Sequence, residues 1–93
     1  MQQVKMGLAQ IIQFQYPNTA KLEKFISEFC HDYYLKKDGN MFIVSSLKDD
    51  YQIELVIENY GLYIHRSGNY FEIFGQLIEA ISGKFGKTTI EDY

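Results

Sequence analysis

YQIELVIENYGLYIHR, residues 51–66, is the stretch that decides the fold class. Between residues 51 and 58, apolar and polar side chains alternate with only Val56 out of step, which is typical of a strand with one buried and one solvent-exposed face. The Asn-Tyr-Gly sequence of residues 59–61 follows as a turn, because asparagine and glycine tolerate the positive φ angles of tight hairpins. Residues 62–66 return as a second strand, so the stretch predicts an antiparallel hairpin.

A strand and a helix are predicted upstream of this hairpin. Isoleucine and aromatic side chains alternate with glutamines ahead of Pro17, which indicates a strand that begins near Val4. Asn18 or Thr19 can then cap a helix. Apolar side chains recur at helical spacing as far as Tyr33, which predicts a helix of about 15 residues.

A turn and a strand are predicted between that helix and the hairpin. The Lys-Lys-Asp-Gly-Asn sequence of residues 36–40 suits a helix C-terminus, where lysines favour the negative end and Gly39 can adopt a left-handed conformation. Residues 41–47 follow as a strand, and its Phe-Ile-Val run indicates partial burial on both faces.

A second helix and a last strand are predicted after the hairpin. Asn69 and Glu72 have the spacing of a capping box, and apolar side chains recur at helical intervals over residues 71–85. This pattern places Gly75 on the apolar face, where a missing side chain would let the helix approach the sheet closely. Residues 87–92 are predicted to form the short final strand.

These elements predict one α+β domain that spans residues 1–93. The element order β-α-β-β-β-α-β gives about five strands, and each helix has one apolar face, so both helices are expected on the same side of a mostly antiparallel sheet. The expected architecture is therefore a two-layer sandwich, a ferredoxin-like arrangement with an extra hairpin strand.

The composition favours a folded protein with a basic partner. The 93 residues are 46% hydrophobic, include eight tyrosines and seven phenylalanines, and carry a formal net charge of -3. Such a hydrophobic fraction can form a packed core. The acidic balance argues against a protein whose main task is to bind nucleic acid, because that task needs clustered cations.

We expect a cytoplasmic protein without a membrane partner. No apolar run reaches the roughly 18 residues of a membrane span, and residues 1–16 lack the apolar segment of a signal peptide. The single cysteine, Cys30, cannot form an internal disulfide, which fits a reducing compartment, and its place on the helical apolar face predicts a small buried side chain.

No catalytic, metal or cofactor signature is present in the sequence. Cys30 and His31 lack the further cysteine or histidine ligands that a zinc site needs. The SGKFGK sequence of residues 82–87 follows a helix and lacks the spacing of a phosphate-binding loop. Glu54 and Glu58 would lie roughly 13 Å apart along a strand, too far to act on one bond. We therefore predict a protein that is not an enzyme and holds no cofactor or metal.

The hairpin places carboxylates on the sheet face opposite the helices. Asp50, Glu54 and Glu58 share that face with Gln52 and Val56, and the glutamines of the first strand are expected to join them. A two-layer sheet always has one solvated face, so an ordinary polar surface is one interpretation. The functional interpretation is an acidic docking surface for a basic protein, since complementary charge speeds encounter and excludes wrong partners.

Aromatic side chains support the docking hypothesis. Tyr60, Tyr63 and Tyr70 cluster around the hairpin and the entry to the second helix, and His65 lies near a strand end, where functional residues are common. Tyrosine is enriched among binding hot spots because it supplies a large contact area with few rotatable bonds. The alternative is that these rings cover the edges of a small core.

The leading functional hypothesis is a small cytoplasmic protein that occludes a basic partner, of which a toxin-neutralising immunity or inhibitor protein is the most concrete form. Asp50, Glu54 and Glu58 would meet cations of the partner, and the three tyrosines would anchor it. One alternative is a dimeric α+β domain that binds a small ligand or acts as an enzyme near His65 and Arg66. Another is an accessory subunit of a larger complex.

Overall fold

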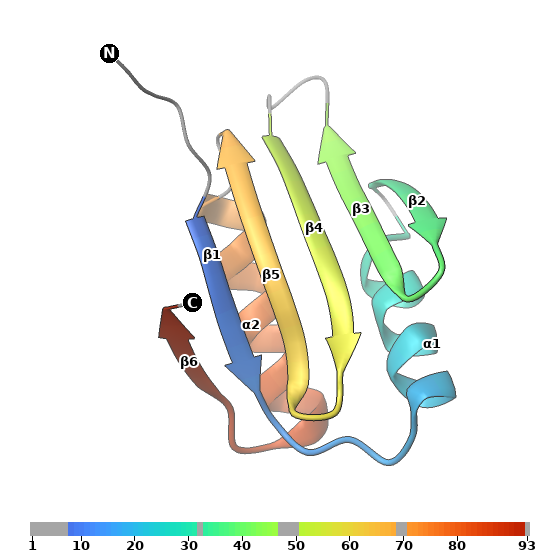
Figure 1. Cartoon of the computed structure of the whole chain (residues 1–93), viewed down its shortest axis with the longest axis vertical. Helices are drawn as coiled ribbons and strands as arrows, with labels where there is room; N and C mark the ends of the chain where they lie inside the picture. The colour runs from blue at the N-terminus through green and yellow to red at the C-terminus, as the bar shows by residue number, and fades with distance from the viewer. Residues whose placement is uncertain (1–7, 32, 47–50, 69–70, 93) are drawn as a thin grey trace.

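The hairpin predicted for residues 51–66 forms the middle of a six-stranded antiparallel sheet. The computed structural model describes residues 8–31, 33–46, 51–68 and 71–92. Its elements are β1 (Leu8–Gln13), α1 (Thr19–Phe29), β2 (Tyr34–Asp38), β3 (Met41–Ser46), β4 (Tyr51–Glu58), β5 (Gly61–Gly68), α2 (Phe71–Phe85) and β6 (Thr89–Asp92). The strands follow one another across the sheet in the order β2-β3-β4-β5-β1-β6. Both helices lie behind the sheet in Figure 1, which leaves the opposite face without a helix.

The predicted α+β class with two helices and an antiparallel sheet is confirmed, but the strand count and the order of elements differ from the prediction. Six strands form in the order β-α-β-β-β-β-α-β, in place of about five strands. The predicted ferredoxin-like arrangement is wrong, because β1 lies between β5 and β6 and is antiparallel to both. The additional strand is β2, which lies at one edge of the sheet. Within the described residues, neither helix is long and apolar enough to cross a membrane.

Strand β2 occupies residues that were predicted to form a helix end and a turn. Helix α1 ends at Phe29, so the predicted extension to Tyr33 is wrong. Only Leu35 of β2 is partly buried, and the other four side chains are exposed, so the strand shows no alternation by which the sequence could reveal it. Gly39, with φ +64°, serves the hairpin turn between β2 and β3 and not a helix C-terminus.

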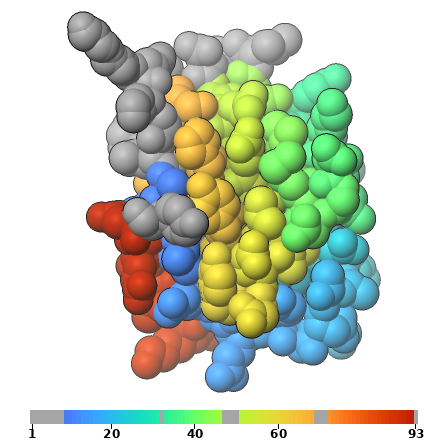
Figure 2. Space-filling view, viewed as in Figure 1, coloured from blue at the N-terminus to red at the C-terminus, as the bar shows by residue number. Residues whose placement is uncertain are grey.

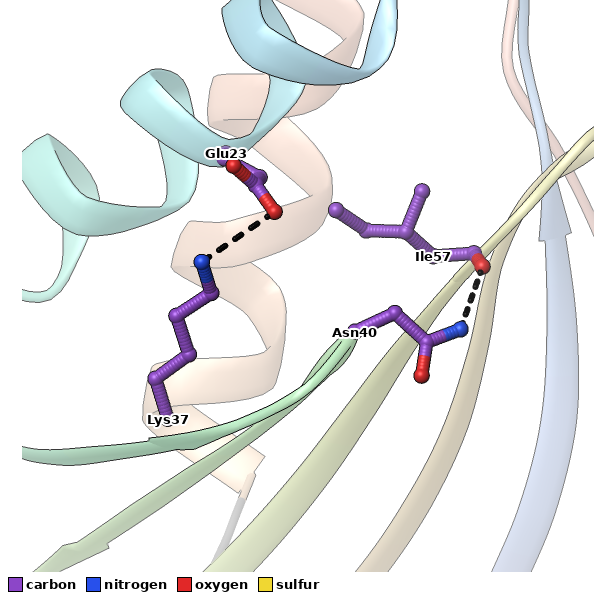
Figure 3. Close-up of polar contacts among 4 residues, drawn as sticks. All are labelled: Glu23, Lys37, Asn40 and Ile57. Carbon is purple, nitrogen blue, oxygen red and sulfur yellow. Dashed lines mark hydrogen bonds and ion pairs between the residues drawn. The ribbon is translucent and has the colours of Figure 1, made fainter.

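Polar contacts hold this hairpin against α1 and β4 (Figure 3). Lys37 of β2 reaches Glu23 of α1, with Nζ and the carboxylate oxygen 3.3 Å apart. In the turn, the Asn40 side-chain amide donates to the Ile57 carbonyl over 3.3 Å, and the Ile57 backbone amide donates to the Asn40 carbonyl over 3.2 Å. Pairing with β3 and the contacts with α1 and β4 therefore stabilise β2 more than the intrinsic strand propensity of its residues does.

The start of α1 agrees with the sequence prediction, whereas the packing of α2 differs from it at Ile73 and Gly75. Asn18 caps α1, because its side-chain oxygen accepts from the Lys21 backbone amide over 2.9 Å. The capping box predicted at Asn69 lies outside the described residues. In α2, the buried side chains include Ile73, which the predicted stripe missed. The prediction for Gly75 is wrong, since that residue is exposed and open space surrounds its missing side chain.

The core lies between the helices and one face of the sheet. Alternate residues of β4 and β5 point into it, including Ile53, Leu55 and Ile64, each at most 1% exposed. Gly61, with φ +139°, begins β5 where the chain passes very close to β1: a Cβ atom at Gly61 would lie 2.3 Å from the backbone oxygen of Ile12 and 3.0 Å from the Phe14 ring. Only glycine, which has no Cβ atom, fits this close approach of β5 to β1.

Cys30 is buried against the core, as predicted, and burial raises the pKa of its thiol from 9.0 to about 11. The folded state therefore favours the protonated thiol. The contribution of this thiol to the free energy of unfolding is complete below about pH 9 and is lost as the pH rises through about 11. We expect the wild type to lose about 2 kcal/mol of unfolding free energy over this range relative to Cys30→Ala. Urea unfolding of both proteins between pH 7 and 11 measures this difference, and a difference independent of pH would contradict it.

Candidate protein-docking face

The candidate functional site is the face of the sheet that no described helix covers, here called the open face. Side chains alternate along each strand, so the residues between the buried ones of β4, namely Gln52, Glu54, Val56 and Glu58, point toward this face. Paired residues of neighbouring strands share a face. The space-filling view in Figure 2 shows the side chains of β3, β4 and β5 spread over it.

A row of apolar and aromatic side chains crosses the open face. Ile11 of β1 pairs with Tyr63 of β5, Tyr63 pairs with Val56 of β4, and Val56 pairs with Met41 of β3. Each of these four side chains is partly exposed. Neighbouring strands are about 4.8 Å apart, so the row is roughly 14 Å long. We call Ile11, Tyr63, Val56 and Met41 the apolar row.

Charged and polar side chains border the apolar row. Glu54 lies directly opposite His65 of β5, and Glu58 pairs with Gly61 at the end of the hairpin. The Gln52 amide donates to the Glu54 carboxylate over 3.2 Å. In the described strands, the open face carries four carboxylates and one lysine, which are Asp38, Glu54, Glu58, Glu91 and Lys36. The open face therefore combines an apolar centre with an acidic border.

The structure brings four of the predicted site residues to the open face, namely Glu54, Glu58, Tyr63 and His65. Tyr60 lies apart from Tyr63, in the turn between β4 and β5, where it lines a groove at the end of the sheet. Asp50 and Tyr70 lie outside the described residues.

The glutamines of β1 divide between the two faces, so the expected amide-rich surface is only partly present. Gln13 lies on the open face opposite Gly61. Gln10 pairs with Ile64 and therefore lies on the helix side, where its amide donates to the Asp92 carboxylate over 2.9 Å. The open face is consequently less polar than the sequence predicted.

Sequence reasoning missed two members of the apolar row, Ile11 and Met41. It also missed Ile43 and Tyr34, which point toward the open face as well. Tyr34 is 77% exposed at the β2 edge. The available signal was the two-residue period of each strand. Ile43 lies between the buried Phe42 and Val44, and Ile11 precedes the buried Ile12. That signal cannot show which residues become neighbours, since this depends on the register between strands.

A second concave region lies at the end of the sheet near the β4–β5 turn. The groove has a volume of about 1180 Å³, and its lining includes Gln15, Tyr16, Asn59, Tyr60 and Lys87. The Tyr16 hydroxyl donates to the Glu58 carbonyl over 2.7 Å, which fixes one wall. No carboxylate side chain lines this groove among the described residues.

The described residues contain no group of three or more His, Cys, Asp and Glu side chains placed to hold a metal ion. Comparison of the chain with protein-family models and with curated protein sequences gives no match.

Proposed function

We propose that the chain is a small cytoplasmic protein-binding module that docks a basic protein on its open face and occludes that partner's own functional surface, as an immunity or inhibitor protein does. The observation that carries this proposal is the apolar row bordered by carboxylates. Protein interfaces commonly have such an arrangement, with a dry apolar centre rich in tyrosine and methionine and a polar rim.

The open face is large enough for a specific complex. Six strands at about 4.8 Å separation span roughly 24 Å, and the eight residues of β4 extend about 26 Å. Their product, about 600 Å² before side-chain relief is counted, is an upper limit, because β1, β2, β3 and β6 are shorter than β4. A standard interface covers roughly 800 Å² per partner. A partner that covers most of the sheet can therefore be held without a deep pocket.

Charge complementarity supports a basic partner over a second copy of this chain. The carboxylates of the open face outnumber its single described lysine, Lys36. Two copies meeting through this face would bring two such acidic borders together, whereas a basic protein would pair with them. Such pairing accelerates association and disfavours neutral or acidic competitors.

The test compares two double variants with the same change in charge. Glu54→Lys with Glu58→Lys alters the open face, and Glu72→Lys with Glu79→Lys alters exposed positions of α2. Proteins captured from a host-cell lysate by the tagged wild type are identified by mass spectrometry, purified and titrated by calorimetry. We expect a basic protein whose affinity falls at least about tenfold with the open-face variant and less than about threefold with the α2 variant.

Three outcomes would overturn the proposal. The first is equal loss of affinity with both double variants, and the second is the lack of any purified protein that binds. The third is a homodimer, detected by light scattering, that Val56→Lys converts to a monomer, which would assign the open face to a second copy.

A further inference from the structure

A cationic pocket lies between the two helices, at the end of the molecule where α1 begins and α2 ends (Figure 1). Its volume is about 330 Å³, near the lower limit for small-molecule sites. Three lysines line it, Lys21 and Lys24 from α1 and Lys84 from α2, together with the single acid Glu28. We call it the helix-end pocket. It belongs to the helical layer, away from the open face.

The positive charge of the helix-end pocket is largely unbalanced. Lys24 and Glu28 are 4.0 Å apart with both side chains mostly exposed, so their ion pair contributes little. Lys21 and Lys84 form no ion pair with the described residues. This concentration of cations occurs in a chain whose formal net charge is -3.

Lys21 is the least expected of these cations. It lies in the first turn of α1, which contains no acidic residue. The N-terminal end of a helix is positive, so a lysine there is unfavourable where an acid would be favourable. Lys84 differs, because it lies in the last turn of α2 and offsets the negative end of that helix. Residues that oppose the charge preference of a helix end are expected more often at functional sites than elsewhere.

The apolar part of the helix-end pocket is firmly held. The Phe25 and Phe85 rings meet edge to face, with centroids 5.2 Å apart and an interplanar angle of 73°. Phe85 also stacks on Phe14, with centroids 5.2 Å apart. Pro17 completes the apolar lining. An anionic group near the lysines could therefore carry a planar or apolar substituent that packs on these rings.

We propose that the helix-end pocket binds a small aromatic phosphate ester, with the phosphate near Lys21, Lys24 and Lys84 and the ring against Phe25 and Phe85. Charge-assisted hydrogen bonds from ammonium groups to phosphate oxygens supply the recognition. In this proposal, the SGKFGK sequence of residues 82–87 binds the phosphate through the Lys84 side chain and not through the backbone of a phosphate-binding loop. This activity goes beyond docking at the open face and does not depend on it.

Phenyl phosphate and inorganic phosphate are the probes, added to the ¹⁵N-labelled full chain and followed by NMR. We expect saturable shifts of the amide signals of residues 19–28 and 82–87, with phenyl phosphate binding at least about threefold tighter than inorganic phosphate. Lys21→Gln combined with Lys84→Gln weakens phenyl phosphate binding about tenfold or more. A control variant, Lys36→Gln on the β2 edge strand, removes one positive charge outside the pocket and changes phenyl phosphate binding less than about twofold.

Sodium chloride at equal ionic strength distinguishes site binding from screening. The same shifts with chloride, shifts that do not saturate, or equal effects of the pocket and control variants would overturn the proposal. A phosphotyrosine peptide that binds more than about tenfold tighter than phenyl phosphate would assign the pocket to a phosphorylated protein and reject the small ligand. None of these results bears on the open face, whose failure would appear only in the partner titrations.

Discussion

Replacing Gly61 with alanine is expected to destabilise the protein by about 3–5 kcal/mol. Two costs combine at this position. The backbone has φ +139°, which side chains other than glycine rarely adopt, and a Cβ atom would lie 2.3 Å from the Ile12 carbonyl oxygen. Because the obstacle is backbone, relief requires β1 and β5 to separate locally. Urea unfolding followed by circular dichroism measures the change.

The same substitution at Gly75 provides a control with the opposite expected sign. Gly75 lies within α2, is exposed, and has open space where a Cβ atom would be placed. Alanine there should stabilise the protein by about 0.5–1 kcal/mol, because it reduces the conformational freedom of the unfolded chain. A Gly61→Ala protein as stable as the wild type would contradict the close approach of β5 to β1 at Gly61. Destabilisation by Gly75→Ala would contradict the open space at Gly75.

Tyr63→Ala is expected to weaken binding of the basic partner by at least about 30-fold, which corresponds to about 2 kcal/mol. Tyr63 lies within the apolar row, between Ile11 and Val56, where a docked partner would exclude water most completely. Aromatic side chains in such central, desolvated positions supply most of the binding free energy. Calorimetric titration of the purified partner measures the change, and the thermal unfolding midpoint shows whether the fold is intact.

Tyr34→Ala is the matched control for Tyr63→Ala. Tyr34 points toward the same face but lies on the edge strand β2 and is 77% exposed. Contacts at an interface rim contribute little, so we expect a loss of less than about threefold. A larger loss with Tyr34→Ala than with Tyr63→Ala would move the centre of the docking surface to the β2 edge.

Local sequence patterns predicted the elements whose residues alternate strongly between buried and exposed. The hairpin of β4 and β5 and the cap at Asn18 depend on neighbours in the chain, so they were predictable. Strand β2 was missed because four of its five side chains are exposed, and its formation depends on pairing with β3 and on the contact between Lys37 and Glu23.

The candidate site was predictable only within a single hairpin. Glu54, Glu58, Tyr63 and His65 belong to paired strands that are adjacent in sequence, so their shared face follows from alternation and one turn. The full apolar row also needs Ile11, whose position opposite Tyr63 depends on the register of distant segments. The grouping of Lys21, Lys24 and Lys84 around one pocket likewise appears only after α1 and α2 pack together.

The position of β1 in the sheet has a consequence for the order in which the chain assembles during synthesis. This strand leaves the ribosome before the other described strands, yet both of its neighbours, β5 and β6, are made later. Strands β2 to β5 form consecutive hairpins that can pair as they emerge. The apolar side chains of β1, in contrast, stay exposed until β5 is synthesised. Translation pauses before residue 61 should therefore prolong the exposure of β1 to chaperones more than that of any later described strand.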